Sequence, residues 1–326
     1  MASPKQQRIA PNRGSVNRSG VRKSPAGKPP SAPKVRKATA RDWVAGARLR
    51  TLPLSIAPVA LGTAAAHTAL APWAWWRIAL ALAVSVCLQI GVNYANDYSD
   101  GVRGTDKFRL GPSRLTGSGA AKPRTVLTVA LVFFGFAAIA GAILVVHIGQ
   151  YWLFGVGAVC IVAAYFYTGG KRPYGYYGLG ELFVFVFFGL VATLGTTFVQ
   201  LGHVNLEAWL SGVAIGLIAC AVLMVNNIRD LPQDKLAGKL TLAVLIGNLP
   251  ARIVYVVMIL LPFVILIYFV VLYPNATYTY FALFLALPAA LIGFTGKTPQ
   301  ELVLALQLTS FAALVYAIGL GWALAF

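Results

Sequence analysis

The chain has 326 residues, of which 58% are hydrophobic and 11% are charged, and its mean hydropathy is +0.73. A soluble domain carries about 25% charged residues, so this composition excludes an ordinary soluble protein and indicates an integral membrane protein. The net charge of +18 suggests nucleic acid, but the basic residues gather in the first fifty residues and beside apolar segments, which argues against a nucleic-acid partner.

Residues 1–40 are predicted to be a disordered basic tail. They are rich in Pro, Ser, Lys, Arg and Gly, and they contain no acidic residue and too little apolar surface to fold alone. We expect this tail to lie in the cytoplasm against anionic lipid. Its prolines and its lack of an amphipathic period disfavour a transit peptide, and it has no apolar core typical of a secretory signal. Residues 41–326 are predicted to form one transmembrane domain.

The rest of the chain contains nine apolar segments of the length that crosses a bilayer, about 20 residues each. We therefore predict an all-α polytopic membrane protein with nine transmembrane helices. The fourth and eighth segments are short, which leaves eight as the alternative number. The nine segments are residues 52–70, 75–96, 125–147, 151–168, 180–201, 208–228, 252–273, 277–294 and 302–325.

The positions of the basic residues test this topology. With the tail in the cytoplasm and nine crossings, every Lys and Arg except Arg77 falls on the cytoplasmic side, as the positive-inside rule requires. The C-terminus at Phe326 is then outside. The two polar stretches that contain most of the acidic residues both face the cytoplasm.

Five of the nine acidic residues lie in these two stretches, each of which follows a predicted membrane helix. Carboxylates beside hydrocarbon are costly, so such clusters indicate a functional site. The first stretch contains Asn93, Asp97, Asp100 and Asp106. The second stretch contains Asn226, Asp230 and Asp234. The spacing places Asn93, Asp97 and Asp100 on one face of a helix. The three residues of the second stretch also fall near one face, although Pro232 leaves the geometry of that helix open.

Carboxylate and amide oxygens are hard ligands that suit Mg²⁺, which commonly joins one or two carboxylates to substrate phosphates. Basic residues accompany both stretches and supply the charge that binds the remaining phosphate oxygens. These residues are Arg103, Lys107, Arg109, Arg114, Lys122, Arg229, Lys235 and Lys239. A single Asp is more often a structural ion pair with a neighbouring Arg, but two matched clusters on one side favour a shared metal–diphosphate site.

Other familiar sites are not supported. The chain has no Walker pattern, so an ordinary nucleotide site is not expected. Cys87, Cys160 and Cys220 are scattered through apolar segments without a CxxC pair, which argues against disulfides and zinc.

A third stretch, YTGGKRPYGYYGLGE (Tyr167–Glu181), falls on the same side of the membrane. It has two interpretations: an interfacial aromatic belt on a flexible loop, or a lid over the polar site. Four phenylalanines follow it, and they either line a cavity for an apolar chain or face lipid. These are Phe183, Phe185, Phe187 and Phe188.

NDYSD followed by GTD, and NNIRD followed by QDKLAGK, resemble the two Asp-rich motifs of the UbiA superfamily of intramembrane prenyltransferases. The motifs of this chain resemble most closely those of the menaquinone branch, the 1,4-dihydroxy-2-naphthoate polyprenyltransferases. The motifs of that branch are NYANDYSDGxRGTD, RxGPxR, YTGGxxPYGYxGLGE, VFFG and NNxRDxxxDxxxGKxTLAV. RLRTLPLSIAPV (Arg48–Val59) is similar to the first span of the family, and the resemblance covers about residues 41–326.

The resemblance implies nine helices around a central cavity in a bacterial cytoplasmic membrane, with the active site facing the cytoplasm. It implies that the enzyme transfers a polyprenyl group from a Mg²⁺-bound prenyl diphosphate to 1,4-dihydroxy-2-naphthoate. Loss of CO₂ and release of diphosphate would give demethylmenaquinol for menaquinone (vitamin K2) synthesis. The oligomeric state, the prenyl chain length and any general base stay open.

The resemblance also assigns roles to residues by position. The expected catalytic residues are Asp97, Asp100, Asp230 and Asp234. The expected metal ligands are Asp97, Asp100, Asp106, Asn226, Asp230 and Asp234. The residues expected to contact the diphosphate are Asn93, Arg109, Arg114 and Lys239. The chain departs from the family pattern at Leu245, where an Arg is usual, and at Lys171 and Arg172, which add charge to the third stretch.

Two alternatives stay open. Another UbiA-type transferase would use a different aromatic acceptor, such as 4-hydroxybenzoate, homogentisate or haem. An ion-coupled transporter would also combine repeats, prolines within spans and buried aspartates. A transporter would carry its carboxylates nearer the membrane midplane, whereas these lie at helix ends with cations beside them.

Overall fold

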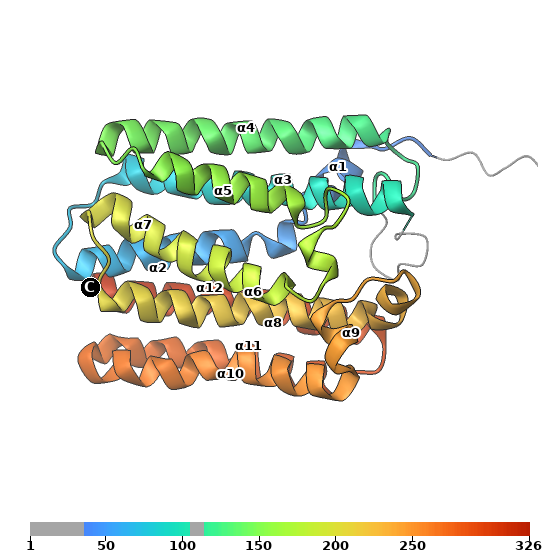
Figure 1. Ribbon diagram of the computed structural model, residues 1–326. Coiled ribbons are helices and arrows are strands. Elements are labelled where there is room, and N and C mark those ends of the chain that lie inside the picture. The colour runs from blue at the N-terminus through green and yellow to red at the C-terminus, as the bar shows by residue number, and fades with distance from the viewer. Residues whose placement is uncertain (1–35, 105–113) are drawn as a thin grey trace, which may run out of the picture. The chain divides into compact units, whose positions relative to one another are not determined.

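The computed structural model describes residues 36–104 and 114–326, and its helices run alongside one another (Figure 1). Most of the predicted basic tail lies outside these residues, as do Asp106 and Arg109. The helices are α1 (Ala40–Gly46), η1 (Leu49–Thr51), α2 (Pro53–Thr68), α3 (Trp75–Arg103), α4 (Pro123–Ile148), α5 (Leu153–Phe166), η3 (Tyr174–Tyr176), α6 (Gly180–Val184), η4 (Phe185–Val191), α7 (Ala192–Leu201), α8 (Leu206–Leu236), α9 (Leu242–Ile246), α10 (Asn248–Leu272), η5 (Pro274–Ala282), α11 (Leu283–Thr295) and α12 (Pro299–Ala325).

Seven helices of the described part are long and apolar enough to cross a membrane. The bent segment made of α1, η1 and α2, with an angle of 46°, would be an eighth. The remaining predicted segment, the fourth (residues 151–168), corresponds to α5, an apolar helix of 14 residues that is shorter than a usual span. The chain is thus an all-helical, multi-pass membrane protein, and each predicted segment is helical along most of its length.

The polar stretches are helical as well. α3 continues through the first stretch to Arg103, and α8 continues through the second stretch to Leu236. Pro232 lies inside α8 without ending it. The aspartates of these stretches lie in the last two turns of α3 and α8, and both helices terminate at the same end of the assembly (Figure 1). The second stretch is followed by α9. The C-terminus lies at the opposite end.

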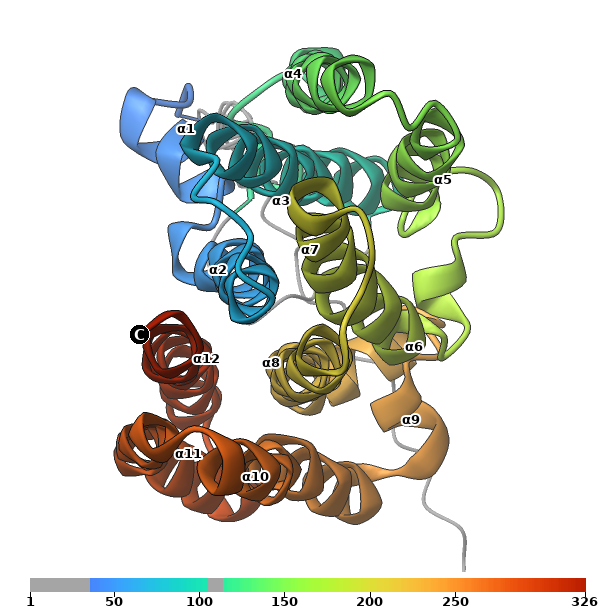
Figure 2. The same cartoon turned by 90° about the vertical axis from the view of Figure 1, so that its left-hand side faces the viewer.

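Seen along the helices, the fold has three groups: α3, α4 and α5 on one side, α2, α7, α8 and α12 in the middle, and α10 and α11 on the other side (Figure 2). The main apolar core joins the middle group to α10 and α11, and includes Leu61, Ile218, Ile259, Ala286 and Leu320. A smaller core joins α3 to α4. No residue of α5 is buried, so space remains between α5 and the middle group.

Small residues allow two helices to approach closely beside that space. A Cβ atom added to Gly189 of η4 would lie 2.6 Å from the Cα atom of Gly216 and 2.7 Å from the carbonyl oxygen of Gly212, both on α8. Membrane helices commonly pack through such small residues because no hydrophobic force draws them together. This contact fixes the phenylalanine-rich segment against the helix that carries the second polar stretch.

Candidate functional site

A cavity of about 590 Å³ lies between the helices that carry the two polar stretches. Its polar end is lined by Arg48, Gln89, Asn93, Asn96, Asp100, Arg114, Tyr167, Thr168, Asn226, Asn227, Asp230, Gln233, Asp234 and Lys239. Seven residues predicted from the two stretches therefore line one cavity: Asn93, Asp100, Arg114, Asn226, Asp230, Asp234 and Lys239. The rest of the wall is mostly apolar, which gives the site a charged end and a hydrocarbon end.

Asp100 is the centre of the first stretch and is buried. Its Oδ2 atom accepts a hydrogen bond from Arg114 Nη1 at 2.5 Å, and its Oδ1 atom accepts one from the Tyr176 hydroxyl at 2.5 Å. Arg114 Nη1 also donates to the carbonyl oxygen of Asn96 at 2.9 Å. Charge-assisted bonds of this kind are strong and directional, so they hold the carboxylate and the guanidinium in fixed positions at the cavity wall.

Asp97 has a different environment. Its two carboxylate oxygens accept the backbone N–H groups of Leu115, at 2.9 Å, and Thr116, at 2.8 Å. It is buried and does not line the cavity. In this structure Asp97 therefore anchors the chain that follows the first stretch, and this anchoring places Arg114 beside Asp100.

Asn93 and Gln89 connect the cavity wall to the turn before α2. Asn93 Nδ2 donates to the carbonyl oxygen of Ala47 at 2.9 Å, and Gln89 Nε2 donates to Thr51 Oγ1 at 3.1 Å. Between these two contacts, Arg48 has a φ of 55°, a left-handed conformation that is uncommon for a residue with a side chain. The two amides thus hold a strained turn that presents Arg48 at the cavity, and such strain is frequent at functional sites.

The second stretch is organised by a buried arginine. Arg229 Nη2 lies 2.6 Å from Asp230 Oδ2 and donates to Asn226 Oδ1 at 2.9 Å, while Arg229 Nε donates to Asp230 Oδ1 at 2.7 Å. One turn later, Asp234 lies 3.7 Å from Lys239 Nζ. Both aspartates line the cavity, so both stretches present carboxylates and cations to the same space.

Most of the third stretch (Tyr167–Glu181) forms the α5–α6 loop, residues 167–179, and this loop contacts both polar stretches. Its Tyr176 donates to Asp100 through the hydroxyl and accepts the Leu240 N–H at 3.0 Å through the carbonyl. The cationic ends of Arg103 and Lys239 lie over the Tyr176 ring, 5.4 Å and 5.2 Å from its centre. These contacts tie the loop to the ends of both polar stretches, and we call this loop the lid.

Further contacts hold the α5–α6 loop in place. Thr168 Oγ1 donates to Asn96 Oδ1 at 2.6 Å, and the Arg103 guanidinium donates to the carbonyl oxygens of Thr168 and Gly170. The Tyr174 hydroxyl donates to the carbonyl oxygen of Ala163 at 2.7 Å, and burial raises the pKa of Tyr174, so this hydroxyl stays protonated.

The positions that depart from the family pattern are found at this loop. Lys171 and Arg172 are exposed on it, away from the cavity lining. Leu245 of α9 packs against the loop, since a Cβ atom added to Gly178 would lie 2.5 Å from Leu245 Cδ1. At this position the chain therefore makes an apolar contact with the lid, where the family pattern usually has an Arg.

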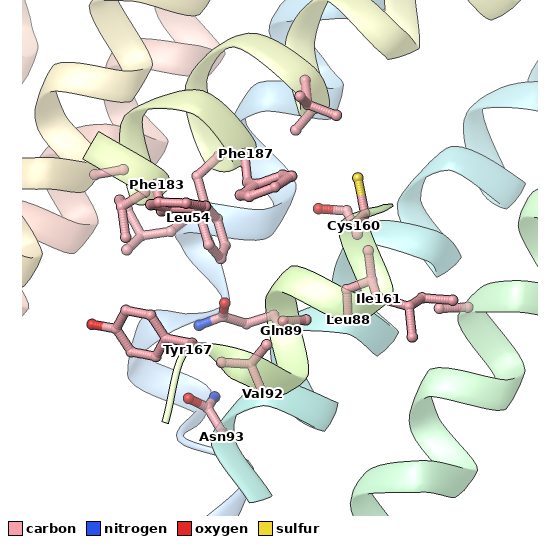
Figure 3. Close-up of a pocket in the computed structure, with 18 of the residues that line it drawn as sticks. Leu54, Leu88, Gln89, Val92, Asn93, Cys160, Ile161, Tyr167, Phe183 and Phe187 are labelled. Carbon is pink, nitrogen blue, oxygen red and sulfur yellow. The ribbon is translucent and has the colours of Figure 1, made fainter. Parts of the chain in front are cut away.

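Three of the four phenylalanines after the loop line the cavity: Phe183, Phe187 and Phe188. Figure 3 shows Phe183 and Phe187 across from Leu88 and Ile161, with Gln89, Asn93 and Tyr167 at the polar side. Phe185 instead packs against α8, because a Cβ atom added to Gly216 would lie 2.9 Å from its ring. The segment thus supplies aromatic surface to the apolar part of the cavity.

The oxygen atoms at the polar end have the chemistry that a hard divalent cation requires. In the described parts of the chain, no three His, Cys, Asp or Glu residues are already grouped as a metal site. The carboxylates of Asp100 and Asp230 are instead paired with arginines. Gln233 lines this end, and its buried Oε1 atom has no hydrogen-bond partner among the residues described. Such an atom is suited to a ligand that brings positive charge or a hydrogen-bond donor.

Several residues at this site escaped prediction from the sequence, notably Gln89, Asn96, Thr168 and Tyr176. Each acts through a partner that is far away in the sequence, such as the Tyr176–Asp100 pair, separated by 76 residues. The sequence carries a signal for Tyr176, because this residue lies within the stretch rich in Tyr and Gly for which a lid is one of the two interpretations. No comparable signal distinguishes Gln89 from other polar residues in an apolar helix.

The chain matches the UbiA prenyltransferase family over residues 55–302. It is 48% identical over 288 residues to a protein of Mycobacterium tuberculosis named 1,4-dihydroxy-2-naphthoate octaprenyltransferase, covering 87% of this chain and 97% of the relative. A protein of the same name from Escherichia coli is 38% identical over 227 residues, covering 64% of this chain and 70% of the relative.

Solved structures share the fold. A UbiA homologue from Aeropyrum pernix has a TM-score of 0.64 at 17% identity, over 82% of this chain and 96% of that chain. A UbiA homologue from Archaeoglobus fulgidus, solved with DMAPP and Mg²⁺, has a TM-score of 0.59 at 15% identity, over 87% and 99% of the two chains.

Proposed function

The chain belongs to the UbiA prenyltransferase family, and from this membership we infer that it transfers a polyprenyl group to 1,4-dihydroxy-2-naphthoate in menaquinone synthesis. The relatives that carry this activity in their names support the inference, and so does the structure of the cavity. One observation is decisive: both Asp-rich stretches and the α5–α6 loop meet at the charged end of a cavity whose remaining wall is apolar. This arrangement suits a substrate with a diphosphate head and a hydrocarbon tail.

The residues at the polar end fit a divalent cation held together with a diphosphate. Asp100, Asp230, Asp234 and Asn226 line the cavity and offer hard oxygen atoms. Of the other two ligands expected from the sequence, Asp97 binds backbone N–H groups outside the cavity lining, and Asp106 lies outside the described residues. Mg²⁺ is the cation we propose, which agrees with the related Archaeoglobus fulgidus protein that was solved with Mg²⁺. When bound, Mg²⁺ withdraws electron density from the diphosphate leaving group.

The side chains of the protein itself bind and position the diphosphate. Arg114 and Lys239 line the cavity beside the carboxylates and can donate to phosphate oxygens, and Arg109 and Asn93 share this role by the family pattern. Asp100 holds Arg114 in position through one carboxylate oxygen and the lid in position through the other, which accepts the Tyr176 hydroxyl. The protein thus stabilises charge that develops on the leaving oxygen, with little reorganisation at the moment of reaction.

Exclusion of water is the second task. When the C–O bond of the allylic diphosphate breaks, the allylic carbon becomes cationic and reacts with whatever nucleophile is nearest. The α5–α6 loop closes the polar end, and Phe183, Phe187 and Phe188 cover the apolar wall, so the aromatic acceptor is the nucleophile at hand. The ring carbon that bears the carboxylate forms the new C–C bond. The bond to the carboxylate then breaks, CO₂ leaves, and its electron pair restores the aromatic ring.

The proposed location follows from the same site. The polar end carries the basic residues, and we place it at the cytoplasmic face of a bacterial cytoplasmic membrane, where soluble diphosphate can leave. The topology supports this placement, since the C-terminus lies at the opposite end of the helices (Figure 1). Carboxylates at the ends of α3 and α8 fit an enzyme better than a midplane ion relay.

Product analysis tests the proposal. Purified protein in detergent is incubated with Mg²⁺, a polyprenyl diphosphate and 1,4-dihydroxy-2-naphthoate labelled in its carboxyl group. We expect labelled CO₂, free diphosphate and a prenylated naphthohydroquinone by mass spectrometry. A prenylated product that keeps the label would contradict decarboxylation. Preference for 4-hydroxybenzoate would assign the chain to another acceptor class, and ion flux in liposomes without diphosphate release would support a transporter.

A further inference from the structure

Gln89 is a polar side chain in a mostly apolar part of the cavity wall. It lies on α3 four residues before Asn93, which at about 1.5 Å per residue places it about 6 Å further from Asp100 along the helix. Asn93 is expected to contact the diphosphate, so Gln89 stands one helical turn beyond the diphosphate head. The ring that reacts with the allylic carbon must approach at this depth of the cavity.

Hydrogen bonds to the turn before α2 fix the orientation of the Gln89 amide. The Thr51 hydroxyl has a single hydrogen, which it donates to the carbonyl oxygen of Arg48 at 2.9 Å. Towards Gln89 it therefore acts as the acceptor, and the amide atom 3.1 Å from it is the nitrogen, Nε2. The amide oxygen, Oε1, accepts no hydrogen bond from the residues that the structure describes, although the residue is only 7% exposed. A carbonyl oxygen that is shielded from water in this way needs a donor, and the cavity is where one can enter.

Aromatic rings surround Gln89. Figure 3 shows it reaching into the space between Tyr167, whose hydroxyl points away from it, and the rings of Phe183 and Phe187. Phe183 is held by stacking on Tyr174, with the ring centres 4.0 Å apart. The hydroxyls in this part of the lining each donate their hydrogen to a backbone carbonyl oxygen, at 2.9, 2.8 and 2.7 Å; these are Thr51, Ser85 and Thr196. A slot with aromatic walls and a fixed hydrogen-bond acceptor suits a flat ring that carries a hydroxyl group.

The chemistry of the proposed substrates decides which of them brings the donor. An ionised diphosphate offers hydrogen-bond acceptors, and a prenyl chain offers neither donors nor acceptors. The aromatic acceptor, 1,4-dihydroxy-2-naphthoate, carries two hydroxyl groups. The hydroxyl on the carbon next to the carboxylate is placed to donate to that carboxylate within the molecule, whereas the hydroxyl across the ring has no internal partner. This second hydroxyl is therefore the donor that matches Gln89 Oε1.

We propose that Gln89 selects and orients the aromatic acceptor: its Oε1 atom accepts a hydrogen bond from the ring hydroxyl that is remote from the carboxylate. The proposal rests on the proposed function, because it concerns the acceptor of that reaction. The hydrogen bond fixes the rotation of the flat ring within its aromatic slot, and so it determines which ring carbon meets the allylic carbon. It also disfavours an acceptor that lacks this hydroxyl, because such a molecule leaves Oε1 buried without a donor.

Replacement of the amide tests the proposal. Gln89→Met keeps the length of the side chain and removes Oε1. The matched control is Gln200→Met, because Gln200 is also a buried amide that donates through Nε2 to a threonine hydroxyl, Thr63 Oγ1 at 2.9 Å, but does not line the cavity. For each protein, KM for 1,4-dihydroxy-2-naphthoate is measured with Mg²⁺ and a polyprenyl diphosphate, together with the inhibition constant of 1-hydroxy-2-naphthoate, which lacks the second hydroxyl. Calorimetric dissociation constants for both compounds, without prenyl diphosphate, report on a variant whose turnover is low.

We expect Gln89→Met to raise KM and the dissociation constant of 1,4-dihydroxy-2-naphthoate by about tenfold, while the inhibition and dissociation constants of 1-hydroxy-2-naphthoate stay within about twofold. Gln200→Met should match the unmodified protein with both compounds. Equal weakening of both compounds by Gln89→Met, which a purely structural role would produce, or no change for either, would overturn the proposal. If the unmodified protein neither bound nor prenylated 1,4-dihydroxy-2-naphthoate, the proposed function would fail instead.

Discussion

Removal of the Tyr176 hydroxyl isolates the contribution of the lid. Tyr176→Phe deletes the hydrogen bond to Asp100 Oδ1 but keeps the ring that lies beneath Arg103 and Lys239. A hydrogen bond to a charged group contributes about 1.5–3 kcal/mol. Asp100 keeps Arg114 as a partner, so the lower part of this range applies. A difference of about 1.4 kcal/mol is tenfold in rate, and we therefore expect kcat/KM to fall about tenfold.

The assay measures prenyl transfer and the formation of free polyprenol together. A loosened lid admits water to the allylic cation, so Tyr176→Phe should raise the share of polyprenol among the products as well as slow the reaction. Tyr177→Phe is the control, because Tyr177 is the next residue and 53% exposed. If both variants gave the same rate and the same product ratio, the role assigned to the loop would be wrong.

Three further outcomes follow from the structure. Gly189→Ala should lower the stability of the folded protein by about 1–3 kcal/mol in a thermal unfolding assay, because its Cβ atom would meet α8, whereas Gly195→Ala, with nothing within 4 Å, should be neutral or slightly stabilising. In a cysteine-free background, a reagent added from outside should label Asn275→Cys and spare Leu236→Cys, and the reverse pattern would refute the orientation. Removal of divalent metal with a chelator should stop turnover, and added Mg²⁺ should restore it; activity that persists in the chelator would contradict a metal-dependent reaction.

The helices were predictable because hydropathy reports which segments face lipid. All nine predicted segments are helical, but the ends were misplaced where a helix leaves the apolar region. α3 extends to Arg103 and α8 to Leu236, seven and eight residues past the predicted ends. Hydropathy measures transfer into hydrocarbon and not the state of the backbone, so polar last turns are invisible to it. The acidic residues in those turns were nevertheless assigned to one face by their spacing.

The cavity was predicted in part. Both Asp-rich stretches do line one space, as their position at helix ends and shared chemistry indicated. The sequence could not show which atoms of a residue already have a hydrogen-bond partner. The amide nitrogen of Asn93 donates to the carbonyl oxygen of Ala47, and both carboxylate oxygens of Asp97 accept backbone N–H groups. Nor could it show that Tyr176 is the partner of Asp100, since contacts across 76 residues depend on tertiary packing.

The central claim is that the two Asp-rich stretches act as a single diphosphate site. A double-mutant cycle on Asp100→Asn and Asp230→Asn tests it most directly, because each change removes one negative charge with little change in shape. Asp42→Asn, at the start of the membrane domain, serves as the control and should keep near-normal turnover.

Turnover is measured with purified proteins whose folding has been checked in detergent. Each single variant should lose most of its activity, and the double variant should be little slower than either, because groups that act as a unit are not additive. Losses that multiply, or near-normal activity in either single variant, would mean that the stretches do not share one diphosphate.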